Sequence, residues 1–143
     1  MNFGRRAFIN LLLSLMLALT WSCAALSGSK APSRAGVYTN LRYVEESGDI
    51  VGIEIIIVYS ADGYKAIFQS SEGVPTVPVI ASVHMDQASA EFVVPTGSSY
   101  AGSKFSGKFV GDELIGTFDR GQVSYDGKRE FRLTRTNSYW QGK

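Results

Sequence analysis

The sequence predicts an all-β domain, an antiparallel meander of about eight strands that closes into a small up-and-down barrel. From Val37 onward, short runs rich in Val, Ile, Phe and Tyr alternate with Gly, Asp, Ser and Pro. No window keeps a helical period of apolar residues for three turns. The links between the runs are too short for a crossover helix, so successive strands should pair antiparallel. Closure removes exposed strand edges, which favours a barrel over an open sheet.

The expected strands occupy the ranges 37–44, 50–60, 63–70, 77–85, 89–95, 104–110, 113–124 and 128–137. In a meander, the links after odd-numbered strands share one end of the barrel. The two longest links, 71–78 and 96–103, therefore open at the same end as the turn Tyr125-Asp126-Gly127. Tyr100 and Tyr125 are expected at this mouth, and loops of this kind are where binding residues concentrate.

The second strand, IVGIEIIIVYS, is apolar on both faces in its later half. Its second face therefore needs a cover, for which a tether, a partner, a lipid surface, the segment before Val37 or a flanking loop are all open. Glu54 is the one acid inside this strand. On an interior face it is a candidate for binding a polar ligand group, and on an exterior face it is an edge or surface charge.

The stretch KFSGKFVGDELIGTFD, residues 104–119, predicts a hairpin with a two-residue type II′ turn at Gly111-Asp112. One register satisfies both faces of this hairpin. It pairs Phe109 with Leu114 on one face, Lys108 with Ile115 on the other, and continues outward through the pairs Gly107–Gly116, Phe105–Phe118, Ser106–Thr117 and Lys104–Asp119. The bare glycine pair marks a bend, room for a side chain, or space for a ligand. A hollow barrel would present Phe105 and Phe118 to that ligand.

We find no catalytic constellation in the sequence. His84 is the only histidine, and strand alternation places it facing solvent with Ser82 and Asp86. Residues at i, i+2 and i+4 of a strand point in parallel about 7 Å apart, so these three cannot form a hydrogen-bonded relay. One histidine without a cysteine partner does not make an ordinary zinc site, and no calcium-binding loop pattern is present. We therefore expect no enzymatic activity, no metal and no cofactor.

The N-terminus reads as an export signal. Residues 7–21, AFINLLLSLMLALTW, suit the apolar region of a signal peptide better than a membrane span of about 20 residues. Around Arg5, Arg6 and Phe8 the sequence resembles the twin-arginine export motif, although a general secretory signal remains open. Removing this segment with its two arginines changes the net charge from +1 to −1, which leaves no electrostatic footprint for nucleic acid.

Cys23 is the sole cysteine and directly follows the apolar segment. The run Leu19-Thr20-Trp21-Ser22-Cys23 resembles a bacterial lipobox, in which the cysteine becomes lipidated and then the mature N-terminus. Cleavage after Ala24 or Ala25 and an uncleaved anchor are the alternatives. The expected organisation is a signal helix over 1–22, a lipidated N-terminus and flexible tether over 23–36, and a β-barrel over 37–140.

The run at 45–75 is similar to small exported bacterial proteins of uncharacterised function, and the architecture resembles lipocalin-like and avidin-like barrels. The sequence therefore predicts a non-enzymatic lipoprotein of the bacterial envelope, facing the periplasm or the cell surface. Its barrel binds a small apolar ligand or an envelope protein. The alternatives are a soluble periplasmic or secreted form, a periplasmic inhibitor of a cell-wall-degrading enzyme, and a small enzyme.

Overall fold

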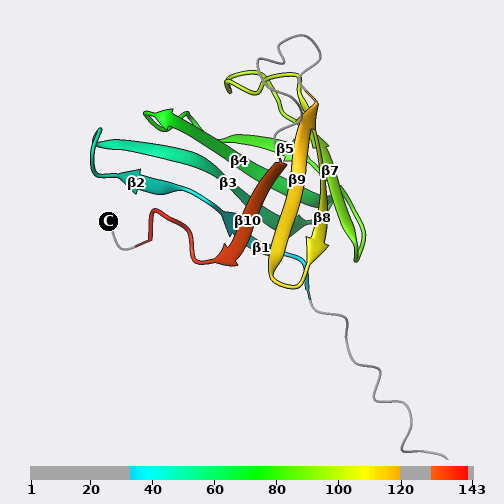
Figure 1. The fold of residues 1–143 in the computed structure, drawn as a ribbon. Coiled ribbons are helices and arrows are strands. Elements are labelled where there is room, and N and C mark those ends of the chain that lie inside the picture. Colours follow the sequence, from blue (N-terminus) through cyan, green and yellow to red (C-terminus); the bar gives the residue numbers. More distant parts are fainter. Residues whose placement is uncertain (1–32, 120–129, 142–143) are drawn as a thin grey trace, which may run out of the picture. The chain divides into compact units, whose positions relative to one another are not determined.

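The computed structural model describes residues 33–119 and 130–141 of the chain (Figure 1). The predicted signal helix, with Arg5, Arg6, Phe8 and Cys23, and the predicted turn at Tyr125 lie outside these ranges. The regular elements of the described residues are strands: β1 (Gly36–Thr39), β2 (Arg42–Val44), β3 (Asp49–Ser60), β4 (Gly63–Gly73), β5 (Val79–Ser82), β6 (His84–Met85), β7 (Ser89–Val93), β8 (Lys104–Val110), β9 (Glu113–Asp119) and β10 (Glu130–Thr136).

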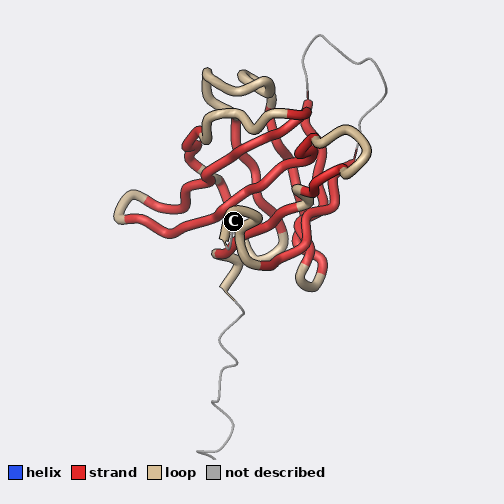
Figure 2. Tube along the Cα trace, turned by 90° about the vertical axis from the view of Figure 1, so that its left-hand side faces the viewer, coloured by secondary structure: helices blue, strands red, loops and turns tan. Residues whose placement is uncertain are grey.

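The strands form one antiparallel sheet that curls into a nearly closed barrel. Nine of them follow the order β5-β4-β3-β1-β10-β9-β8-β7-β6, and β2 pairs beside β3. Pairing of β1 with β10 brings the first and last described strands together. The two ends of the path, β5 and β6, are separated in the chain by Val83 alone, so the sheet curls back toward itself (Figure 2). The predicted all-β class, antiparallel meander and barrel-like closure are confirmed at this level.

Two predicted strands are each divided in the structure. The predicted strand 77–85 becomes β5, which pairs with β4, and β6, which pairs with β7. The first half of this segment thus forms one end of the strand path, and its second half forms the other end. The predicted strand 37–44 is interrupted after Thr39, because the side-chain Oδ1 of Asn40 takes the place of a backbone carbonyl and accepts the N–H of Ile53 at 2.8 Å.

The barrel interior is a packed hydrophobic core. Phe68 on β4 and Phe118 on β9 come from opposite walls, separated by three strands of the path through β1. Their ring centroids are nevertheless only 5.5 Å apart. Direct aromatic contacts have centroid separations of this size, so the two rings fill the barrel at their level. The other core side chains include Tyr38, Ile53, Ile55, Ile57, Phe92, Val94, Tyr100, Phe105, Phe109, Leu114 and Leu133.

The β8–β9 hairpin has the predicted register at every pair, from Val110 with Glu113 to Lys104 with Asp119. Gly111 has φ +59°, as the first central residue of a type II′ turn requires, and no non-glycine residue among those described has positive φ. The glycine pair, Gly107 on β8 and Gly116 on β9, makes room for the ring of Phe105 on β8. A Cβ built on Gly107 would lie 2.7 Å from Cε1 of Phe105, and one on Gly116 2.6 Å from Cζ of the same ring.

Arg34 closes the end of the barrel opposite the long loops. Its Nε donates to the carbonyl of Gln87 at 3.1 Å and its Nη1 to that of Gly111 at 3.0 Å, which joins the β6–β7 and β8–β9 turns. The guanidinium carbon lies 5.0 Å from the ring centroid of Phe109. The hydroxyl of Tyr38 donates to the Arg34 carbonyl at 3.0 Å. Burial raises the pKa of Tyr38 above its ordinary value.

Candidate functional site

The residues predicted as binding contacts divide between the interior and the outer face of the barrel. Tyr100, Phe105 and Phe118 come together inside, with ring centroids 4.6 Å apart for Tyr100–Phe118 and 5.0 Å for Phe105–Phe118. Glu54 lies at an outward position of β3, between two core isoleucines. Sequence reasoning therefore pointed to two separate places.

Tyr100 belongs to the core at the mouth of the barrel. Its ring contacts Phe68 at a centroid distance of 5.6 Å as well as Phe118, and the residue is 7% exposed. The loop that carries it is tied to the end of β4 by a 3.1 Å contact between the hydroxyls of Ser70 and Ser99. Strand parity thus placed Tyr100 at the correct end, and its side chain fills the mouth.

The outer face of β1, β3, β4 and β5 carries an apolar row. Val37 pairs with Ile56, Ile56 with Ile67, and Ile67 with Ile80, so the four side chains lie side by side across four strands. The row is about 14 Å long, since neighbouring strands lie about 4.8 Å apart. Ile80 is 66% exposed, and the other three are half-buried. We call these four residues the outer apolar row.

An uncharged segment continues this row toward the mouth. Residues 74–82, VPTVPVIAS, contain no acidic or basic side chain. Val74 and Val77 are 81% and 76% exposed, more than Ile80. Depletion of charge with exposed apolar side chains is typical of the centre of a protein–protein interface.

The C-terminal residues Ser138–Trp140, which we call the strap, cover the polar positions beside the outer apolar row. Glu54 is only 2% exposed despite its outward position. Its Oε1 accepts the Ser138 hydroxyl at 2.7 Å, and its Oε2 accepts the Tyr139 backbone N–H at 2.9 Å. Among the described residues, these donors belong neither to residues 33–36 nor to a loop flanking β3. The cover for this part of β3 comes from beyond the last strand.

Gln69, which pairs with Glu54 across β3 and β4, holds the end of the strap. Its Oε1 accepts the Trp140 indole N–H at 2.7 Å, while its Nε2 donates to the Thr76 carbonyl at 2.7 Å. One amide side chain therefore connects the strap to the uncharged segment. The strap, the outer apolar row and the exposed valines together form the candidate site.

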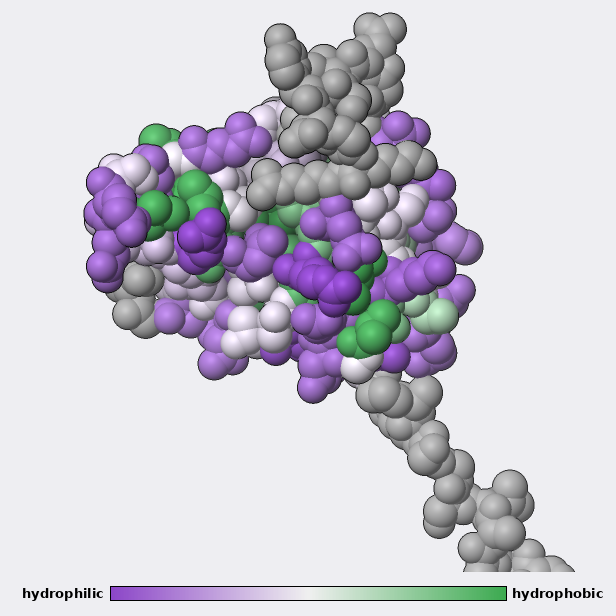
Figure 3. Space-filling view, viewed as in Figure 1, coloured by the Kyte–Doolittle hydropathy of each residue, from purple (hydrophilic) through white to green (hydrophobic). Residues whose placement is uncertain are grey.

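The outer face of β8, β9 and β10 has a different character. Arg132 contacts Glu113 at 3.3 Å, and Lys104 contacts Glu91 at 2.8 Å. The face over β9 and β10 in Figure 3 is mostly hydrophilic, with hydrophobic residues in separate spots. The outer surface of the barrel thus has an apolar side and a charged side.

The residues around His84 are engaged in separate contacts. The Ser82 hydroxyl oxygen accepts a hydrogen bond from the Lys65 ammonium at 2.9 Å. Asp86 caps its own turn, where its Oδ1 accepts the Ala88 N–H at 2.7 Å, and such bonds lower its pKa. His84 is exposed on β6. Among residues 33–119 and 130–141, no group of three or more His, Cys, Asp and Glu side chains could hold a metal ion.

Sequence reasoning missed the site residues on β4 and β5 and in the strap, among them Ile67, Gln69, Ile80 and Trp140. A signal was available for Ile67, because Ala66-Ile67-Phe68 is apolar on both strand faces in the same way as the end of β3, whereas nothing in this run indicates a role for Gln69. Ile80 becomes significant only through its register with Ile67. Trp140 follows the last strand in a polar stretch without periodicity, so no local pattern assigns it a contact.

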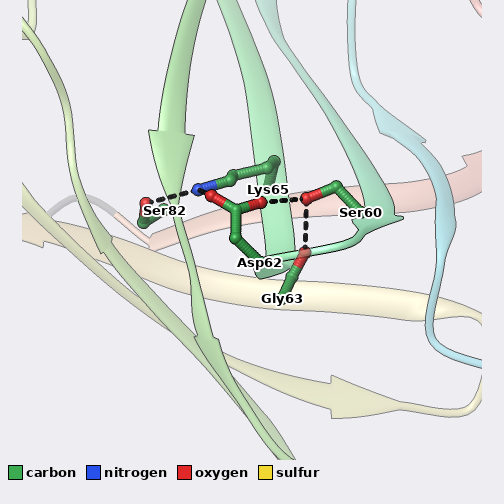
Figure 4. Close-up of polar contacts among 5 residues, drawn as sticks. All are labelled: Ser60, Asp62, Gly63, Lys65 and Ser82. Atoms are coloured by element: carbon green, nitrogen blue, oxygen red, sulfur yellow. Dashed lines mark hydrogen bonds and ion pairs between the residues drawn. The ribbon is translucent and has the colours of Figure 1, made fainter.

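The Lys65 side of the apolar row ends in a charged turn, shown in Figure 4. The Lys65 ammonium lies 2.8 Å from Asp62 Oδ2 and also reaches Ser82 on β5. Ser60 contributes its hydroxyl to Asp62 Oδ1 and to the Gly63 carbonyl. The hydrogen bond from Lys65 is the first cause, and that from Ser60 the second, of a pKa of Asp62 lowered to about 2.

Replacing Lys65 by Met should therefore raise the midpoint at which Asp62 titrates. Because the folded-state pKa lies below the ordinary value of 3.8, this carboxylate stabilises the fold above about pH 4, and the contribution disappears as the pH falls through 2. The measurement is the carboxyl carbon shift of Asp62 by NMR against pH. Lys108→Met on the far side is the matched control, and an unchanged Asp62 midpoint in K65M would contradict the assignment.

Comparison with protein-family models, with curated proteins and with solved structures gives no match to this chain. Within the part of the chain that the structure describes, no helix has the length and apolar character needed to cross a membrane.

Proposed function

We propose that this chain is a non-enzymatic lipoprotein of the bacterial envelope that binds a protein partner on the outer surface of its barrel. The observation that carries the choice of surface is the contact between Phe68 and Phe118 from opposite walls, 5.5 Å between ring centroids. A ligand at this level would have to displace aromatic rings. A partner on the outside displaces only water.

The outer apolar row and the uncharged segment 74–82 support the same choice. Ile80, Val77 and Val74 are already exposed, so burying them against a partner gains hydrophobic free energy without prior rearrangement. The absence of charge from 74–82 avoids the cost of desolvating unpaired ions. The charged side over β8–β10 also exposes Val110, but its ion pairs would have to be desolvated on binding.

The lipid anchor is proposed from the sequence. Cys23 stands at the end of the export-like segment, and nine residues lie between it and Ser33, so ten peptide links join the two positions. An extended tether of that length spans at most about 35 Å. The barrel would stay close to the membrane while most of its surface remained accessible to a partner.

The test uses the full chain expressed in a bacterial host. Mass spectrometry of the mature N-terminus should find an acylated Cys23, whereas a free Ala25 or Leu26 would refute the anchor. A photo-cross-linking residue at Val77 should form one defined adduct with an envelope protein, identified by mass spectrometry.

Ile80→Glu should reduce that adduct about tenfold or more, because it places an unpaired charge in an apolar contact. Lys108→Glu, on the charged side, is the matched control and should leave the adduct unchanged. An adduct equally insensitive to both changes would refute binding through the apolar side.

A small apolar ligand at the mouth is the second candidate, because Tyr100, Phe105 and Phe118 converge there. A fluorescent apolar probe that binds the wild-type chain, and binds a Tyr100→Trp variant more weakly, would favour this candidate over the partner.

A further inference from the structure

We propose that Glu54 and Gln69 form a peptide-recognition site on the outer face, occupied in the structure by the strap of the same chain. A segment of the protein partner with the same order of groups replaces it: a hydroxyl side chain, then a backbone N–H, then an indole. The inference rests on the proposed function and deepens it, because it gives the chemistry of the partner.

Glu54 is a built acceptor rather than a surface charge. Its carboxylate is at an outward strand position but 2% exposed, and its two oxygens take two different donors of the strap at 2.7 and 2.9 Å. Hydrogen bonds to a charged acceptor are the strong ones, and a buried carboxylate without donors is costly. The site therefore selects a segment that presents a hydroxyl and the next backbone N–H together.

Gln69 adds specificity for an indole. Its Nε2 is committed to the Thr76 carbonyl, which turns its Oε1 toward the strap as an acceptor. The N–H of Trp140 meets that oxygen at 2.7 Å. An indole offers a donor on a large apolar ring, and tryptophan is enriched among the residues that dominate binding energy at interfaces.

The position of the strap makes its exchange possible without opening the barrel. The last described strand ends at Thr136, and residues 138–140 belong to no described strand. Asn137 between them is exposed, and Tyr139 and Trp140 are only half-buried. The strap therefore lies on the barrel without contributing to its strand pairing.

The site continues into the apolar surface proposed for the partner. Ile56 and Ile67 stand two residues along from Glu54 and Gln69 on the same outer face, and Thr76 belongs to the uncharged segment. A partner segment bound at Glu54 and Gln69 would thus extend over the outer apolar row. The strap occupies one edge of this surface in the unbound chain.

The experiment uses a fluorescent peptide, TNSYWQGK, with the sequence of residues 136–143. The host is the full chain with Ser138, Tyr139 and Trp140 changed to glycine, whose fold is checked by circular dichroism. We expect this host to bind the peptide at least tenfold more tightly than the wild-type chain, whose own strap competes. Replacing the tryptophan of the peptide by alanine should weaken binding about tenfold or more.

Adding Glu54→Gln to the glycine host should abolish most of the binding, whereas Glu113→Gln, an outward acid on β9, should leave it intact. A folded glycine host that does not bind the peptide, or that binds it equally well with E54Q, would overturn the proposal. Should E54Q fail to fold, Gln69→Leu serves in its place.

A concentration-dependent wild-type dimer lost on Trp140→Ala would also overturn the assignment to a partner, because the occupant would be a second copy. If the Val77 adduct persists while the peptide fails to bind, this inference alone falls and the proposed function stands.

Discussion

Replacing Phe118 by alanine is expected to lower the free energy of unfolding by about 3–5 kcal/mol, the range for removing a buried aromatic side chain. The ring lies 4.6 Å from that of Tyr100, 5.0 Å from Phe105, 5.5 Å from Phe68 and 5.6 Å from Phe131. These rings come from different walls and from a loop, so they cannot all move in to fill the space. The measurement is urea denaturation followed by circular dichroism.

Thr117→Ala is the matched control, because Thr117 is the neighbouring residue on the outward face of β9. Its loss should change stability by no more than about 0.5 kcal/mol, as is usual for surface substitutions. F118A should also gain binding of a small aromatic compound such as benzene, which wild-type protein lacks, because an apolar cavity of this size accepts such a guest. Equal binding by wild type would show an open interior and contradict the packed barrel.

The hairpin register could be predicted because its information is local. Gly111-Asp112 fixes the turn, and the alternation of Phe105, Gly107 and Phe109 with lysine and serine fixes the faces. A slip by one residue would place rings in water. Antiparallel order and near closure followed from short links. These features depend on residues that are close together in the sequence, so the sequence pattern is enough to predict them.

The division of strands and the course of the strap could not be predicted in this way. The division at Val83 depends on two separate strands, because β4 pairs with the first half of the segment and β7 with the second. The contact of Ser138 with Glu54 spans 84 positions in the sequence. Nothing in either segment alone indicates the other, so Glu54 was left between an interior and an exterior reading. In the structure Glu54 is on the outer face of the barrel and is nevertheless buried. The alternation of apolar and polar residues along a strand distinguishes inward from outward positions and does not predict a buried outward one.

The apolar side of the barrel follows from register rather than from composition. The second face of β3, with Ile56, was predicted to need a cover because the strand is apolar on both faces. A single strand of this kind does not define a surface. Pairing with Ile67 and then Ile80 turns it into a row across the sheet. The apolar side of this barrel can therefore be recognised only once the cross-strand partners are known.

Overpacking a well-packed core costs about 1–3 kcal/mol, and Gly116→Ala is expected to destabilise the fold by an amount toward the upper end of this range. The added Cβ would lie 2.6 Å from Cζ of Phe105, 2.7 Å from the Ser106 carbonyl oxygen and 2.8 Å from Cα of Gly107. Two of these three atoms belong to the backbone of β8, so the strands themselves must separate. Gly116 lacks the positive φ of a left-handed glycine, which makes contact rather than backbone strain the cause.

Gly107→Ala separates this cause from the general effect of losing a glycine. The three atoms nearest to its Cβ would all be side-chain atoms, Cε1 and Cζ of Phe105 at 2.7 and 2.8 Å and Cδ1 of Leu114 at 2.9 Å. Adding Phe105→Leu should therefore reduce the penalty of G107A, measured relative to F105L alone, and leave most of the penalty of G116A. Urea denaturation of the two double-mutant cycles measures both couplings. Equal rescue of the two glycine variants would mean that the ring, and not the approach of the strands, demands glycine at both positions.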